Sequence, residues 1–142
     1  MTTNTSLPAP SLSEHLIRVA GLHALRVLRY VPDEASELDT LTMAYDAGAC
    51  VELLSKAVLA GAHPILLRPV ADWRERVPVD LSGWSRKKTL DAAHVLQGAS
   101  TMLGIAVRPA VAAIQHARND AIHLGAAPDE PERVVADLAL WL

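Results

Sequence analysis

The stretch Leu38–Gly61, LDTLTMAYDAGACVELLSKAVLAG, decides the fold because it is apolar around almost its whole circumference. A helix on the surface of a protein keeps one polar face, whereas a helix that is apolar nearly all round is buried by its neighbours. Alanine and leucine dominate the stretch, and both favour helix. The sequence therefore predicts a long central helix that starts near Asp33–Ser36, runs to about Ala62 and is ended by Gly61 and Pro64.

The composition agrees with a helical domain. The 142 residues suit one domain with a single core, and the apolar fraction of 51% contains no phenylalanine. A net charge of -3 means that a polyanion would have to meet a local basic patch. The single cysteine, Cys50, excludes an internal disulfide and a cysteine-rich zinc site. Its apolar surroundings predict a buried thiol.

A first helix is expected before the central one. Residues 1–10 are polar and contain proline, which is typical of a flexible N-terminal arm. The helix that follows is capped by Ser11 or Ser13 and runs to about Tyr30. Its apolar face comprises Leu16, Val19, Ala20, Ala24, Val27 and Tyr30. A basic stripe on its other side comprises His15, Arg18, Arg26 and Arg29.

The segment from residue 63 to residue 85 is the least regular and most basic part of the chain. Basic side chains interleaved with aromatic ones hold single-stranded nucleic acid by charge and stacking. The candidates for such binding are Arg74, Arg86 and Lys87, close to Trp73 and Trp84. The alternative is that each tryptophan only anchors this insertion onto the bundle.

Three more helices complete the expected fold. The third runs from Ser85 to Met102, the fourth begins at Pro109 and ends before Gly125, and the fifth begins at Pro131. The fold class is therefore all-α, an antiparallel bundle of four to five helices with an irregular basic insertion between the second and third. Residues 11–142 are expected to form this single domain, and their apolar end also fits the N-terminal part of a longer protein.

One arginine of the fourth helix stands among apolar residues. On a helical wheel Arg118 shares its face with Ile114 and Ile122. A guanidinium stays charged at any relevant pH, so a partly buried one needs a carboxylate or an anionic ligand. Glu52 of the central helix, four residues before Lys56 on an apolar stripe, is the candidate structural partner of Arg118.

The segment RNDAIH, Arg118–His123, resembles the Arg-x4-6-His signature of HEPN domains, in which a small polar residue such as Asn119 often follows the arginine. The segment ACVELLSKAVLA, Ala49–Ala60, is similar to the second long helix of that family. The order of the helices is also similar, so the likeness extends from about residue 11 to residue 141. The segment RVAGLH, Arg18–His23, has the same spacing by accident and lacks this context.

The resemblance implies a metal-independent endoribonuclease that acts as a homodimer, with two motif-bearing helices facing each other across a twofold axis. It needs no cofactor. Arg118 would donate hydrogen bonds to phosphate, His123 would act as general base or acid, and Asn119 would orient the phosphate or the imidazole. Attack by a ribose 2′-hydroxyl restricts the substrate to RNA. A role in defence or stress follows from the family, with a protein antidote or a larger defence complex as a further partner. Gly125 stands where antidote-paired toxins of the family often have tyrosine.

Two other functions stay open. In the first, Arg118 and Glu52 form a structural ion pair in a non-catalytic helical module for dimerisation or partner binding. In the second, a metal ion is bound by histidine and aspartate side chains at helical spacing. Its candidate ligands are His116, Asp120, His123 and, from the third helix, His94.

No signal peptide and no membrane-length apolar run are present, so a cytoplasmic protein without membrane contact is expected.

Overall fold

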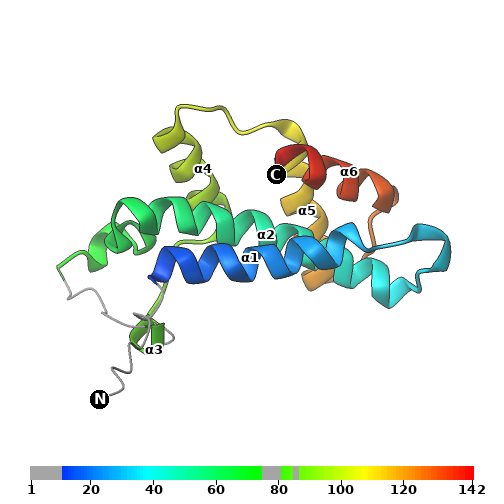
Figure 1. The fold of residues 1–142 in the computed structure, drawn as a ribbon, viewed down its shortest axis with the longest axis horizontal. Helices are drawn as coiled ribbons and strands as arrows, with labels where there is room; N and C mark the ends of the chain where they lie inside the picture. Colours follow the sequence, from blue (N-terminus) through cyan, green and yellow to red (C-terminus); the bar gives the residue numbers. More distant parts are fainter. Residues whose placement is uncertain (1–10, 75–80, 85–86) are drawn as a thin grey trace, which may run out of the picture.

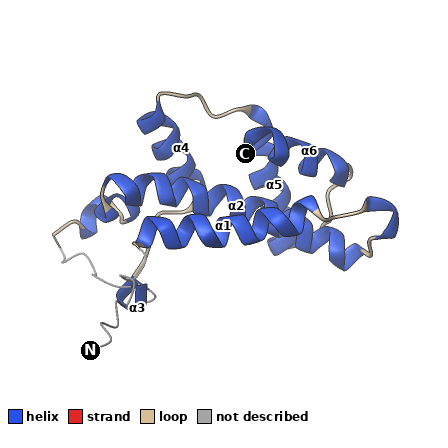
Figure 2. Cartoon of the chain, viewed as in Figure 1, coloured by secondary structure: helices blue, strands red, loops and turns tan. Residues whose placement is uncertain are grey.

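The computed structural model describes residues 11–74, 81–84 and 87–142, and this part of the chain is all-α, without a strand (Figure 2). The expected arm of residues 1–10 lies outside the described residues. The helices are α1 (Leu12–Leu28), α2 (Glu37–Ala62), α3 (Leu81–Trp84), α4 (Ala92–Leu103), α5 (Pro109–Leu124) and α6 (Pro131–Trp141). Short 3-10 turns form at η1 (Pro32–Glu34), η2 (Pro64–Leu67) and η3 (Val70–Asp72). The predicted fold class, an all-α bundle, is confirmed.

The helix α2 is the centre of the fold, as its apolar circumference predicts. It contacts α1, α4, α5 and α6. Figure 1 shows α1 and α2 side by side and antiparallel, with α5 crossing α2 at a steep angle. The main apolar cluster lies where these helices meet and comprises Ala20, Ala24, Val27, Met43, Ala47, Cys50, Val51, Leu96, Val111, Ile114, Val134 and Leu138.

Both long helices begin at serine caps. The Ser11 hydroxyl accepts a hydrogen bond from the Glu14 amide, and the Glu14 carboxylate accepts one from the Ser11 amide. Ser36 caps α2 in the same way. The first helix ends at Leu28 and not at Tyr30, the expected end. Tyr30 instead forms a 2.6 Å hydroxyl–hydroxyl hydrogen bond with Thr40, which ties the α1–α2 connection to α2.

The predicted start of the third helix at Ser85 is wrong, because α4 begins at Ala92. The Asp91 side chain accepts a 3.0 Å hydrogen bond from the His94 amide, and the Asp91 backbone is extended, so the helix can only begin after it. That amide hydrogen bond also lowers the pKa of Asp91. The helix ends at Gly104, whose φ of 66° is the left-handed conformation that glycine adopts without strain.

The two tryptophans of the insertion differ. Trp84 is buried in a second apolar cluster that includes Leu16 and Val95, so it anchors the insertion onto the bundle. Trp73 is half exposed, and its indole N–H donates a 3.0 Å hydrogen bond to the Arg68 carbonyl oxygen. None of the described helices is long and apolar enough to cross a membrane.

Cys50 gives a direct test of this core. Its side chain is fully buried, and burial raises the pKa of the thiol to about 11. At pH 8 only about a thousandth of the thiol would be ionised, and the thiolate is the reactive form. We therefore expect the native protein to resist an aromatic disulfide reagent at pH 8 and to react with one equivalent in 6 M guanidinium chloride. Fast stoichiometric labelling of the native protein would contradict the packing described for α2.

Candidate functional site

The site is built where α5 crosses α2, and Gly48 makes that crossing close. A Cβ atom at Gly48 would overlap the aliphatic part of the Arg118 side chain. One turn earlier on α5, the Gln115 side-chain amide donates a 3.2 Å hydrogen bond to the Gly48 carbonyl oxygen. The absent side chain at Gly48 therefore lets the stem of Arg118 lie directly on α2, with its guanidinium held in place.

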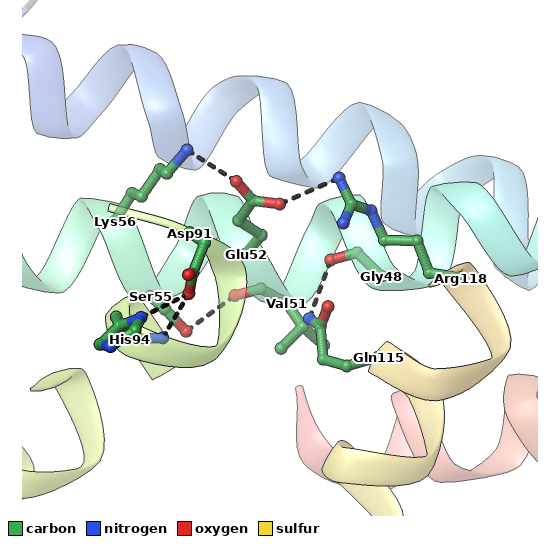
Figure 3. Close-up of polar contacts among 9 residues, drawn as sticks. All are labelled: Gly48, Val51, Glu52, Ser55, Lys56, Asp91, His94, Gln115 and Arg118. Atoms are coloured by element: carbon green, nitrogen blue, oxygen red, sulfur yellow. Dashed lines mark hydrogen bonds and ion pairs between the residues drawn. The ribbon is translucent and has the colours of Figure 1, made fainter. Parts of the chain in front are cut away.

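Arg118 meets a carboxylate that it shares with a lysine. Arg118 Nη2 lies 3.1 Å from Glu52 Oε2, and Lys56 Nζ lies 2.6 Å from Glu52 Oε1. Figure 3 shows the Glu52 carboxylate between these two cationic groups. All three side chains are largely buried: Arg118 is 21% exposed, Glu52 14% and Lys56 15%. Two cations thus share one anion in a partly buried place, and no second carboxylate among the described residues compensates the other positive charge.

Tyr45 connects Arg118 to the next part of the site. The Arg118 guanidinium carbon lies over the Tyr45 ring, 5.9 Å from its centroid, a cation–π contact. His23 of α1 also contacts the ring, which it meets edge-on with 6.1 Å between the centroids. Tyr45 itself is 42% exposed. One aromatic ring therefore contacts both an arginine of α5 and a histidine of α1.

A buried aspartate orients that histidine. Asp46 is only 1% exposed, and its Oδ1 lies 2.7 Å from His23 Nδ1. Its second oxygen, Oδ2, lies 3.1 Å from Arg26 Nε. Sequence reasoning assigned no role to His23, Tyr45 or Asp46. The sequence signal for these residues is Asp46, an aspartate within an apolar helix. A buried carboxylate needs cationic or hydrogen-bonding partners, so its position predicts such partners on a neighbouring helix.

The remaining motif residues lie apart from this cluster. Asn119 and His123 are exposed, and the structure gives neither of them a hydrogen bond or ion pair within the described residues. His123 follows Arg118 by five residues, which places it about 140° further around the helix. A single copy of the chain therefore does not bring the two ends of the Arg118–His123 motif together.

The alternative metal site is not formed in the part of the chain that the structure describes. No three histidine, cysteine, aspartate or glutamate side chains lie there in an arrangement that could hold a metal ion. His116 and Asp120 are exposed on α5. His94, the expected fourth ligand, instead forms a 2.7 Å contact through Nδ1 with the capping carboxylate of Asp91. A metal-binding function is therefore not proposed.

The structure describes two of the three predicted RNA-binding residues of the insertion. Arg74 is exposed after η3, Lys87 is half-buried after α3, and Arg86 lies outside the described residues. The insertion packs near Ala60 at the C-terminal end of α2. That point is about 18 Å along the helix axis from Gly48, at 1.5 Å per residue. The described part of the insertion and the Arg118 cluster are therefore two separate regions.

Comparison with known proteins assigns no family to the chain. No protein-family model, no curated protein and no solved structure matches the chain. The functional conclusion therefore depends on the site itself and on the resemblance of the Arg118–His123 motif.

Proposed function

We propose that this protein is a metal-independent endoribonuclease of the HEPN type, which acts on RNA as a homodimer. The observation that carries the proposal is the Arg118 guanidinium, held over Gly48 and sharing Glu52 with Lys56. The surplus positive charge of this group favours an anion, and a guanidinium offers paired donors to phosphate oxygens. A position fixed before substrate arrives is what stabilisation of a developing charge requires.

The surroundings of His123 support a second copy of the chain. Asn119 and His123 are exposed next to two apolar side chains, Ile122 at 46% and Leu124 at 75% exposure. Exposed apolar side chains around polar groups are typical of interaction surfaces. A twofold contact at this end of α5 would cover Ile122 and Leu124 and would bring His123 of the partner subunit toward Arg118.

A second candidate function is favoured by the ion pair itself. At 3.1 Å, the contact between Arg118 and Glu52 is also what a purely structural pair would look like. In that case the chain is a non-catalytic helical module for dimerisation or partner binding. Its ion pair would then contribute to stability and to nothing else.

Cleavage of single-stranded RNA in the presence of EDTA separates the two functions. We expect the wild-type protein to release fragments with 2′,3′-cyclic phosphate ends and to leave 2′-deoxy strands of the same sequence intact. His123→Asn should lower the rate by about 100-fold or more, as loss of a proton-transfer group does. The matched control is His116→Asn, an exposed histidine on the same helix, which should retain the wild-type rate. A folded protein that leaves RNA intact would be the non-catalytic module.

A further inference from the structure

The proposed reaction needs two proton carriers, and the motif on α5 contains only one of them. A base takes the proton of the attacking 2′-hydroxyl, and an acid supplies a proton to the leaving 5′-oxygen. His123 can fill one of these roles. A second imidazole of the same subunit contacts the Tyr45 ring that Arg118 also contacts: His23 of α1.

We propose that His23, oriented by the buried carboxylate of Asp46, is the general base of the ribonuclease reaction. This inference rests on the function proposed above. It assigns a role to a histidine outside the Arg118–His123 motif and makes the site composite, with residues from α1, α2 and α5. His123 of the partner subunit then remains as the acid.

The hydrogen bonds of Asp46 decide which nitrogen of His23 is free. Arg26 Nε lies 3.1 Å from Asp46 Oδ2, so the carboxylate forms an ion pair with the guanidinium. An ionised carboxylate only accepts hydrogen bonds, so the 2.7 Å contact requires the proton to be on His23 Nδ1. In the neutral ring the lone pair is then on Nε2, which the structure leaves without a hydrogen bond among the described residues. An oriented imidazole with a free lone pair can accept a proton, which is what a general base does.

Of the charged groups that face His23, the carboxylate of Asp46 favours the cationic form of the ring and the two arginines oppose it. The groups that face it are Asp46 and Tyr45 from α2, Arg26 from its own helix, and Arg118 from α5 through the Tyr45 ring. Asp46 stabilises the imidazolium after it takes a proton. Arg118, which contacts the same tyrosine, would hold the phosphate whose neighbouring 2′-hydroxyl loses that proton. The side chain of His23 is 19% exposed, so part of the ring is open to solvent.

The reaction then balances without any other reactant. The 2′-oxygen gives its proton to His23 Nε2 and forms a bond to phosphorus. The bond from phosphorus to the 5′-oxygen breaks, and that oxygen receives a proton from the imidazolium of the partner's His123. The products are a 2′,3′-cyclic phosphate and a 5′-hydroxyl end.

The pH dependence of RNA cleavage by His23→Asn tests this role. Asparagine keeps a donor for Asp46 in the place of Nδ1 but cannot accept a proton. We expect kcat to fall about 100-fold or more and the acidic limb of the pH–rate profile to disappear, because that limb reports the base. His123→Asn should instead lose the alkaline limb, and His116→Asn should keep both limbs. The melting temperature of each variant checks that it is folded.

A folded His23→Asn protein with the wild-type rate and both limbs would overturn the inference and leave the ribonuclease intact. A wild-type protein that does not cleave RNA would overturn the ribonuclease and this role with it. If His23→Asn does not fold, Asp46→Asn provides the same test. The asparagine amide is uncharged and stabilises the His23 imidazolium less than the Asp46 carboxylate does. The acidic limb of the pH–rate profile should therefore move to lower pH, and a limb that does not move would overturn the inference.

Discussion

Gly48→Ala should lower the free energy of unfolding by about 2 kcal/mol, even though alanine is the better helix former. The gain in helix propensity is about 1 kcal/mol. The new methyl group, however, overlaps with Cβ, Cγ and Cδ of Arg118, which destabilises the fold. The Cβ atom of Arg118 is fixed to the α5 backbone, so α5 as a whole must shift away from α2. Such overpacking lowers the free energy of unfolding by up to about 3 kcal/mol. The cost therefore exceeds the gain.

Gly21→Ala is the matched control for this prediction. Gly21 is also inside a helix, but a Cβ atom there would meet nothing within 4 Å. Only the propensity gain remains, so the variant should be more stable by about 0.5–1 kcal/mol. Urea unfolding of both variants measures the two changes. If both glycine variants shift the midpoint in the same direction, the close contact between α2 and α5 at Gly48 is not present.

Arg118→Gln and Glu52→Gln should have opposite effects on RNA binding. Arg118→Gln removes the guanidinium, so RNA binding weakens and cleavage falls by about 100-fold or more, as for loss of one donor to a developing oxyanion. Glu52→Gln removes the anion that Arg118 and Lys56 share. The positive charge left on the two cations should then strengthen RNA binding and make it more sensitive to salt.

Both variants should be less stable than the wild type, because each breaks the same partly buried ion pair. Stability alone therefore does not separate a structural arginine from a functional one, and the sign of the binding change does. Fluorescence anisotropy with a labelled single-stranded RNA, at two salt concentrations, measures it. Equal RNA affinity in the two variants would mean that Arg118 serves only the fold.

The fold could be predicted from the sequence wherever a local signal marks the ends of a helix. Ser36 and Gly125 are such signals, and α2 and α5 begin or end beside them. The third helix begins later than predicted because its N-cap is Asp91, a residue type that favours this position and that the prediction passed over. The cap at Asp91 depends on its own extended backbone, which only the packed chain determines.

The site could be predicted only in part, and for a similar reason. Periodicity placed Arg118 on an apolar face of α5 and Glu52 on an apolar stripe of α2, because each of these properties belongs to a single helix. The contacts of His23 with Asp46 and Tyr45 join α1 to α2, and no spacing within one helix reveals them. The segment Arg18–His23 matches the spacing of the motif by accident, since Arg18 is exposed and contacts His15.

The most direct test mixes two inactive proteins, Arg118→Gln and His123→Asn, and measures RNA cleavage after their subunits have exchanged. If each site takes Arg118 from one subunit and His123 from the other, half of the dimers are mixed and each mixed dimer has one intact site. About a quarter of the wild-type rate should then return. A mixture whose subunits exchange, shown by mass spectrometry, but which stays inactive would contradict a site shared between two copies.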